Sequence, residues 1–231
     1  MLQGVRIYTE RINMSIFHNP DEVRERLSNY GIDYDDLVEA VLRGHGSRGM
    51  SSELHPSNYA GTLFHANTIE ALRDLVLKID GWEMDEPKNL SVTINTKTDV
   101  CIVVASGNQN TGNRWMLPKT RSKKGAFFEA AVLKNSGEIP MRDLFETEEE
   151  YNERLQKIEA RKQALSSTVL YLLINSHEGT PKAELSRPVS YEDGWVKEWS
   201  ERNILDLSMP RGGDSDDTRE EDYDIPVTFR K

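Results

Sequence analysis

The sequence predicts an α+β fold: a mainly antiparallel sheet built from hairpins, with helices packed on it and a flexible acidic C-terminal tail. Three observations support this prediction. Apolar runs typical of strands come in pairs separated by short polar turns, and segments with helical periodicity carry capping residues. The order of strand, three helices, strands, two helices and strands also differs from the regular alternation of βαβ units.

The first elements are a strand and two helices. Apolar residues alternate over 5–17 with one slip of phase, which predicts a long strand with a bulge or a hairpin. Asn19 is a good N-cap, Pro20 suits the first helical position, and Gly31 ends the first helix. A second helix is predicted over 35–42, where the apolar residues share one face.

A long polar segment, 44–61, follows and is rich in Gly, Ser, Asn and Pro. We predict a loop that is functional or mobile. A third helix is expected to begin at Asn67, with Glu70 in the capping-box position. The runs 90–95 and 100–106 then predict a hairpin, and the second run is apolar on both phases, which is typical of a central strand covered on both faces.

The second half of the chain predicts two more helices and another hairpin. Thr147 and Glu150 form a capping box before the longer helix, whose apolar stripe is narrow. The expected elements are a short helix over 125–134, a helix over 148–165, strands over 168–175 and 183–190 joined by a wide turn, and a short helical or irregular segment in which Trp195 and Trp199 share a face.

Composition predicts one domain over 1–209 and an acidic tail over 210–231. Apolar residues make up 37% and charged residues 29%, and the net charge of −10 argues against a uniformly basic surface. A single cysteine, Cys101, lies in an apolar run and is expected to be a small buried hydrophobe rather than a nucleophile. No apolar stretch is long enough to span a bilayer and no signal-peptide layout is seen, so we expect a cytoplasmic protein without membrane contact.

A glycine-containing loop follows the run 100–106 and has the spacing of a phosphate-binding loop between Gly107 and Gly112. Such a loop needs Lys and Ser or Thr directly after its second glycine, and it should open a helix. Asn113 and Arg114 occupy those two positions here, and Pro118 follows soon after. The segment therefore predicts a turn rather than a nucleotide site.

The segment just after that turn is basic. Between 114 and 124 there are five cationic residues and no acid, with aromatic residues beside them, which is the combination that phosphate neutralisation and base stacking require. A second small basic group lies at the border of the 44–61 segment. The predicted nucleic-acid-binding residues are Arg114, Trp115, Lys119, Arg121, Lys123 and Lys124, with Arg43 and Arg48. The alternative is a solvated loop whose aromatic residues belong to the core.

Neither a metal centre nor a catalytic group is predicted. His45, His55 and His65 are too far apart in sequence for the usual spacings of zinc ligands, and no paired cysteines occur. His45 and Ser47 are close along the chain, but no nucleophile elbow supports Ser/His catalysis. We therefore predict no cofactor and no bound metal.

A short stretch resembles the core of PD-(D/E)xK nucleases. Acidic residues at 80–86 precede a strand that ends in Asn95, Thr96 and Lys97. The resemblance implies a Mg²⁺-dependent nuclease, but Asn95 stands where the second acid is required, so the metal site lacks one oxygen charge.

The acidic tail is a candidate partner-binding segment. Its partner-binding residues are predicted to be Asp214, Asp216, Asp217, Glu220 and Glu221, which can dock on a basic partner or compete with nucleic acid for the basic loop. The residues 225–229 could add a strand to a sheet edge. A purely solubilising tail is the simpler alternative.

The hypothesis that the sequence favours is a non-enzymatic cytosolic accessory protein. It contacts nucleic acid through the 114–124 loop and a protein partner elsewhere. The alternatives are a protein–protein interaction module or inhibitor that binds no nucleic acid, and a metal-dependent hydrolase or nuclease. The sequence does not specify the oligomeric state, the identity of the partner or whether the three histidines converge.

Overall fold

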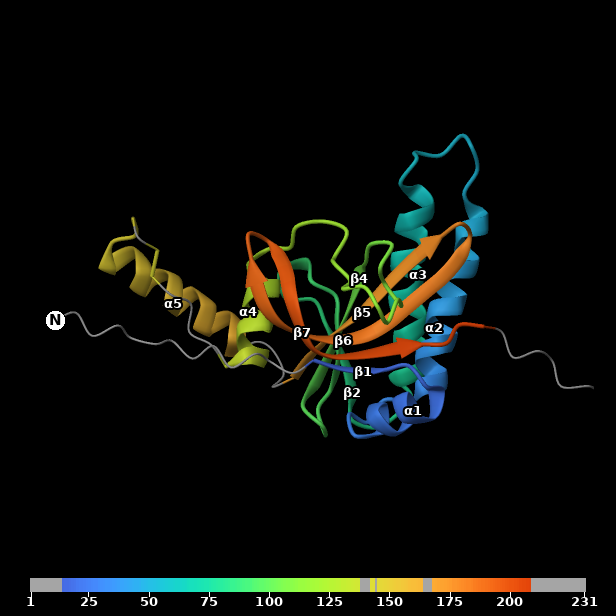
Figure 1. Cartoon of the computed structure of the whole chain (residues 1–231), viewed down its shortest axis with the longest axis horizontal. Coiled ribbons are helices and arrows are strands. Elements are labelled where there is room, and N and C mark those ends of the chain that lie inside the picture. Colours follow the sequence, from blue (N-terminus) through green and yellow to red (C-terminus); the bar gives the residue numbers. More distant parts are fainter. Residues whose placement is uncertain (1–13, 138–141, 144, 164–167, 209–231) are drawn as a thin grey trace, which may run out of the picture.

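A computed structural model describes residues 14–137, 142–143, 145–163 and 168–208 of the chain (Figure 1). Its centre is one seven-stranded sheet in the order β1-β7-β6-β5-β4-β3-β2. The strands are β1 (Ser15–Phe17), β2 (Trp82–Asp85), β3 (Val92–Asn95), β4 (Val100–Ser106), β5 (Thr168–His177), β6 (Thr180–Glu192) and β7 (Trp195–Leu205). The helices are α1 (Pro20–Ser28), α2 (Tyr34–Gly46), α3 (Tyr59–Val76), α4 (Ala126–Ser136) and α5 (Glu148–Gln163), with short 3-10 helices η1 (Ser47–Met50) and η2 (Pro87–Asn89).

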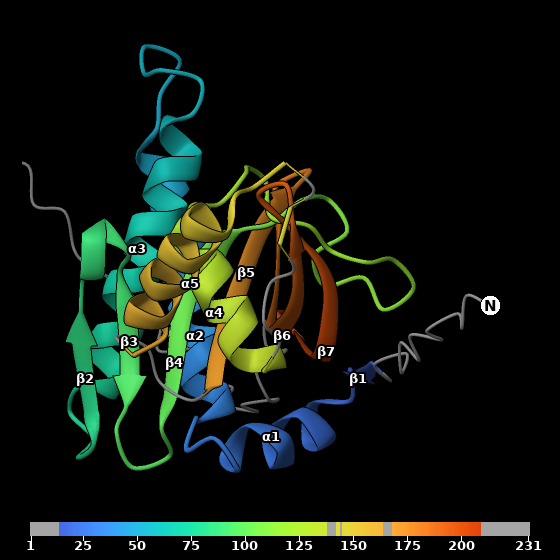
Figure 2. The same ribbon diagram turned by 90° about the vertical axis from the view of Figure 1, so that its left-hand side faces the viewer.

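The helices cover both faces of this sheet. Successive side chains of a strand point to opposite faces, and β4 shows this clearly. Ile102 and Val104 pack into a core with α1, α2 and α3, whereas Cys101 and Val103 pack into a second core with α4 (Figures 1 and 2). The prediction of a central strand buried on both faces, with Cys101 as a small buried hydrophobe, is confirmed.

The α+β class is confirmed, but the expectation of a mainly antiparallel sheet was wrong. The sheet is mixed, because β4 pairs with β5 in parallel and β1 pairs with β7 in parallel. The two predicted hairpins are present as the antiparallel pairs β3–β4 and β5–β6. Sequence patterns indicate local hairpins well. They do not indicate that the hairpin β3–β4 lies beside the hairpin β5–β6, with β4 and β5 as parallel neighbours.

The segment 44–61 is less of a loop than expected. Helix α2 continues to Gly46, η1 follows it, and α3 begins at Tyr59 rather than at Asn67, whose side chain donates to the carbonyl of Leu63 inside the helix. The physical reason is close packing between helices: a Cβ added at Gly44 would lie 2.1 Å from Thr68 Oγ1. Gly44 is therefore a contact residue between α2 and α3, and not a helix breaker.

Two other local predictions have opposite outcomes. Trp195 and Trp199 lie in strand β7, so the helical or irregular segment expected there was wrong. The capping box before α5 is confirmed, because the amide of Glu150 donates to Thr147 Oγ1 at 3.2 Å and the Glu150 carboxylate accepts from the Thr147 amide at 2.9 Å. The predicted start of the first strand, at 5–13, and the acidic tail, 210–231, lie outside the described residues.

Candidate nucleic-acid interface

The connection between β4 and α4, residues 107–125, is held together at its base. Gly107 and Thr120 form an isolated bridge, the amide of Asn108 donates to the carbonyl of Lys119 at 2.9 Å, and the amide of Arg121 donates to the carbonyl of Ser106 at 2.7 Å. The residues between these contacts therefore form a lobe that projects from the end of β4, visible in yellow-green in Figure 2. Residues 113–125, directly after Gly112, contain no helix, which agrees with the prediction of a turn and not a phosphate-binding loop.

A buried ion pair on the sheet fixes the lobe from below. Ala183 and Leu185 face the core under α2 and α3, so Glu184 between them points to the opposite face, which the lobe covers. The Arg202 guanidinium donates to Glu184 Oε2 at 2.6 and 3.0 Å, and the two side chains are 1% and 0% exposed. The same guanidinium donates to the carbonyls of Asn113 and Met116 at 3.0 and 3.1 Å.

Each member of this pair depends on the other. Burial raises the pKa of Glu184 to about 7, while the charge and hydrogen bonds of Arg202 act in the opposite direction. An unpaired charge in such a buried position costs free energy of folding, so the Glu184 carboxylate stabilises the buried guanidinium of Arg202. The guanidinium in turn stabilises the backbone of the lobe through its hydrogen bonds. The pair therefore acts as an anchor that couples the sheet to the backbone at Asn113 and Met116.

The later part of the connection is held by β6 and β7. Trp199 donates its indole N–H to the carbonyl of Pro118 at 3.2 Å. The amide of Lys124 donates to the carbonyl of Gly194 at 2.8 Å, and the Tyr191 hydroxyl donates to the Lys124 carbonyl at 2.5 Å. The backbone is thus fixed at several points, while the side chains of Lys119, Arg121 and Lys123 remain exposed.

The outer end of the lobe carries an exposed aromatic residue. Trp115 is 79% exposed, and the Arg114 guanidinium lies 4.3 Å from the centroid of its ring. Arg114 Nη1 also contacts His18 Nε2 at 2.6 Å, which places Arg114 beside the end of β1. Trp115 is not part of either core, so the alternative in which this tryptophan is a core residue of a solvated loop does not describe it.

Three lysine and arginine side chains of the loop have no acidic partner. Lys119, Arg121 and Lys123 are exposed, and none of them forms an ion pair or a side-chain hydrogen bond with the residues that the structure describes. Elsewhere on the surface many cations are paired, as in Arg24–Asp35 and Lys97–Asp80. The loop is therefore a local positive site on a chain whose net charge is −10.

Lys124 differs from the other three cations. It is half-buried, its Nζ lies 5.2 Å from the centroid of the Phe128 ring, and burial lowers the pKa of its ammonium group. His65 lies nearby, and its Nε2–H donates to the carbonyl of Val104 at 3.1 Å. Burial lowers the pKa of His65, the hydrogen bond to Val104 opposes this, and the charge of Lys124 adds to it. Lys124 packs at the base of the lobe and is not a projecting charge.

The two residues of the second predicted basic group, Arg43 and Arg48, differ in their partners. Arg43 is already neutralised by ion pairs with Glu39 and Asp74, so it has little charge to offer to a ligand. Arg48 in η1 lies near His45, whose Nε2 contacts Ser176 Oγ at 3.2 Å at the end of β5, and the charge of Arg48 adds to burial in lowering the pKa of His45. Arg48 therefore lies near the end of the sheet at which β5 ends and at which the connection from β4 to α4 begins.

The histidines and the acidic stretch do not gather into a metal site. His45 packs against Phe64, His55 stacks on Tyr59 and His65 contacts β4. Within the described ranges no group of three or more His, Cys, Asp or Glu residues is arranged to hold a metal ion. In the stretch that resembles a nuclease core, Lys97 in the β3–β4 turn pairs with the exposed Asp80, which lies just before β2.

Sequence reasoning missed the anchor. Glu184 and Arg202 lie on the neighbouring strands β6 and β7, two register positions apart, because Arg202 pairs with Ser186 and Glu184 pairs with Ile204. The only indication of this ion pair in the sequence was the presence of Glu184 and Arg202 in two consecutive apolar segments. The register shifts near Pro188 conceal which residues of β7 face the lobe.

None of the described helices is long and apolar enough to cross a membrane. The chain matches no protein-family model, no curated protein and no solved structure.

Proposed function

We propose that this chain is a non-enzymatic binding protein that contacts nucleic acid through the lobe at 107–125. The observation that carries the proposal is the unpaired charge of Lys119, Arg121 and Lys123 next to an exposed Trp115, on a chain that is acidic as a whole. Phosphate groups are the natural counter-charge for such a cluster, and an exposed indole is a platform on which a base can stack.

The anchoring of the lobe favours binding as well. Ordering a loop on binding costs conformational entropy, and a loop that is already fixed avoids much of that cost. The contacts of Arg202 and Trp199 with the backbone of the lobe hold the positions from which the cations project. The lobe therefore combines a fixed backbone with long, free cationic side chains.

The test measures binding to single- and double-stranded DNA and RNA over a salt series. The variant Lys119→Gln/Arg121→Gln/Lys123→Gln removes the three unpaired charges. If each cation neutralises a phosphate, the slope of log affinity against log salt falls in magnitude by up to about 2–3.

The control removes the same number of charges elsewhere. Arg24→Gln/Lys78→Gln/Lys157→Gln has an identical net charge, but its cations belong to surface ion pairs on α1, the end of α3 and α5. We expect this variant to keep its affinity and nearly all of its salt slope. An equal loss in the two variants would mean that only the overall charge matters, and an unchanged affinity in the loop variant would remove the proposal.

One observation favours a second function, a protein–protein interaction module. Met116 and Leu117, next to Trp115, are 50% and 47% exposed, and aromatic residues with apolar neighbours are common at the centres of protein interfaces. This function predicts a stable complex that survives nuclease treatment and high salt. Loss of that complex in Met116→Ser/Leu117→Ser, with nucleic-acid affinity unchanged, would assign the apolar tip to a protein partner.

A further inference from the structure

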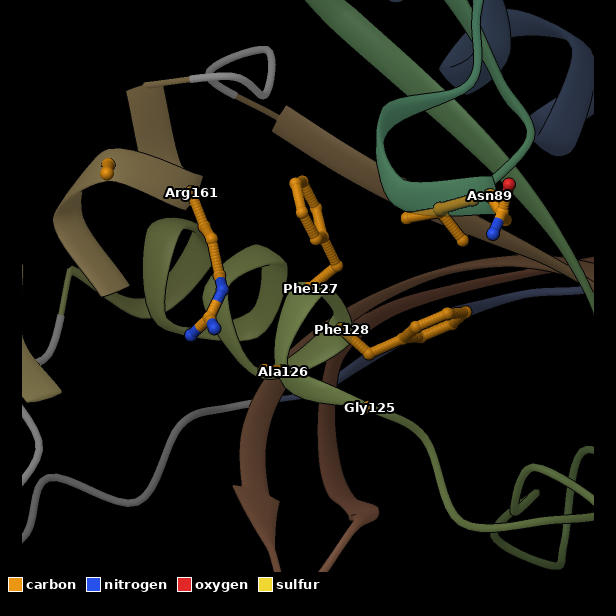
Figure 3. Close-up of a pocket in the computed structure, with 8 residues that line it drawn as sticks. Asn89, Gly125, Ala126, Phe127, Phe128 and Arg161 are labelled. Carbon is orange, nitrogen blue, oxygen red and sulfur yellow. The ribbon is translucent and has the colours of Figure 1, made fainter. Parts of the chain in front are cut away.

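A pocket of about 580 Å³ lies directly beyond the lobe, where the connection enters α4. Its walls come from Asn89 and Leu90 at the end of η2, from Gly125 to Phe128 at the start of α4, and from Arg161 near the end of α5 (Figure 3). Its volume is within the range of roughly 300–1,000 Å³ that is usual for sites that hold small organic groups. The following inference rests on the proposed function and names the kind of nucleic acid that the protein takes.

Arg161 gives this pocket a charge preference. Its side chain is half-buried and forms no hydrogen bond or ion pair with any residue in the described part of the chain. Figure 3 shows it extending from α5 toward the first turn of α4. A cation that is partly desolvated and has no protein partner favours an anionic ligand group. The first turn of α4 also lacks a side-chain cap, so its amide groups favour the same charge.

Two aromatic rings give the pocket a preference for planar groups. Phe127 and Phe128 are both half-buried, and in Figure 3 the ring of Phe127 stands between Arg161 and Asn89. Phe128 is fixed by an edge-to-face contact with the buried ring of Tyr171, at 5.0 Å between centroids. A flat ring can therefore stack on Phe127 while a phosphate attached to it reaches Arg161.

The pocket is continuous with the basic loop. Gly125 lines the pocket and follows Lys123 and Lys124 directly in the chain. The stem of Lys123 lies against Gly194, at the turn between β6 and β7, with 3.0 Å to a Cβ built there. Lys124, next to Lys123, lies with its Nζ 5.2 Å from the centroid of the Phe128 ring, which lines the pocket, so the last cation of the basic loop is beside the pocket wall.

We propose that this pocket takes one unstacked base of a single-stranded nucleic acid, with the base against Phe127 and a flanking phosphate on Arg161. Bases of an intact duplex are paired and stacked, so they cannot enter without an additional cost of unstacking. The protein therefore prefers single strands to duplexes of the same sequence. The loop supplies affinity through phosphates, and the pocket supplies the preference for single strands.

The experiment compares three ligands by fluorescence anisotropy: a single-stranded oligonucleotide, the same strand with one abasic position placed in turn along it, and the duplex. The variants are Phe127→Leu, which keeps apolar packing but removes the stacking ring, and Arg161→Gln. We expect each to weaken binding of the single strand by roughly 5- to 150-fold and to leave duplex binding unchanged. Arg161→Lys should restore part of the affinity, because it restores the charge without the planar group.

Two controls make the result specific. Lys157→Gln removes a charge from the same helix where it pairs with Glu153 on the exposed face, and Phe145→Leu changes an aromatic side chain that is 97% exposed. Both should bind like the wild type. An abasic position that weakens wild-type binding but has no further effect in Phe127→Leu would show that the missing base and the ring are partners.

The inference and the proposed function fail in different ways. If the loop variant loses binding while Phe127→Leu and Arg161→Gln bind single strands and duplexes like the wild type, the pocket inference is overturned and the proposed function stands. Equal losses for single strand and duplex also overturn it. Absence of binding to every polymer by the wild type overturns both.

Discussion

The anchor under the lobe allows a prediction whose size can be worked out from the structure. Replacing Arg202 by Met removes two hydrogen bonds to Glu184 and two hydrogen bonds to the carbonyls of Asn113 and Met116. The substitution keeps an unbranched side chain of similar length, so the packing volume changes little. The buried carboxyl group of Glu184 is left without a cation.

Two contributions determine the cost at pH 8. Hydrogen bonds from a charged donor to two carbonyls contribute at least about 1.5 kcal/mol each. Without Arg202, Glu184 must hold a proton at pH 8, above its wild-type pKa of about 7, and this adds a cost on the order of 1 kcal/mol relative to the wild type. The expected loss is therefore about 4 kcal/mol, within the range of about 3–5 kcal/mol usual for breaking a buried pair.

The cost depends on pH in a definite direction. Because the pKa of Glu184 is raised on folding, the native protein holds a proton that the unfolded chain releases, and this contribution to stability is lost as the pH rises through about 7. In Arg202→Met the pKa rises further, so the loss continues above pH 7. At pH 5.5 the Glu184 carboxyl group is protonated to a greater extent in the wild type than at pH 8, so the penalty of the substitution is smaller.

Urea unfolding at pH 8 and pH 5.5, followed by circular dichroism, measures both values. The double variant Glu184→Leu/Arg202→Met removes both charges and should recover the part of the loss that comes from the buried carboxyl group, because an apolar pair replaces the ion pair. The part that comes from the hydrogen bonds to Asn113 and Met116 should remain lost. Arg24→Met, which removes an exposed ion pair with Asp35, should leave the urea midpoint nearly unchanged. A penalty that is the same at both pH values, or a double variant as unstable as the single one, would refute the reasoning.

Three further predictions concern the lobe and the second core. Trp115→Ala should change the free energy of unfolding by no more than about 0.5 kcal/mol, but weaken binding of single strands by roughly 5- to 150-fold in anisotropy titrations; an unchanged affinity would exclude stacking on this ring. Burial raises the pKa of the Cys101 thiol to about 12, so a disulfide reagent at pH 8 should label this thiol only as urea unfolds the protein. Rapid labelling of the native protein would contradict the buried position of Cys101. Asn135→Leu should lower the free energy of unfolding by about 2–4 kcal/mol, because the buried side-chain amide of Asn135 donates to the carbonyls of Val169 and Pro188 at 2.7 and 2.9 Å. Thermal unfolding measures this loss of stability, and a loss below about 1 kcal/mol would contradict the prediction.

Local structure was predictable where the signal is local. The caps at Asn19 and Thr147 and the two hairpins follow from short stretches of sequence, and the structure has them. The prediction of a loop over 44–61 was wrong at both ends of the segment and holds only for residues 51–58. At the first end, the glycine-rich composition was interpreted through the backbone propensity of residues such as Gly44. Its role depends on Thr68 of the next helix, which packs against it. The tryptophans of β7 were misassigned because a four-residue spacing suits a helix, whereas the register shifts of the β6–β7 pair accommodate it in a strand.

The candidate site was predictable in its composition but not in its assembly. The run of cations from Arg114 to Lys124 is evident in the sequence, and the structure separates its members by burial and pairing. Which cations are free depends on where the acids of distant elements lie, as Glu39 and Asp74 show for Arg43. The anchor and the pocket join residues more than fifteen positions apart in the sequence, and the hydrophobic periodicity of single segments does not indicate such contacts.

The parallel pairing of β4 and β5 explains why the lobe and the pocket occur together. An antiparallel partner can follow its neighbour after a short turn, but a parallel partner requires a connection that returns the chain to the starting end of the sheet. Here that connection runs from Ser106 to Thr168 and contains the lobe, α4 and α5. It leaves β4 at one end, covers the face that carries Glu184 and Arg202, and then builds two walls of the pocket from α4 and α5. The parallel pair that the sequence did not predict is therefore the feature that places both parts of the proposed interface in one continuous stretch of chain.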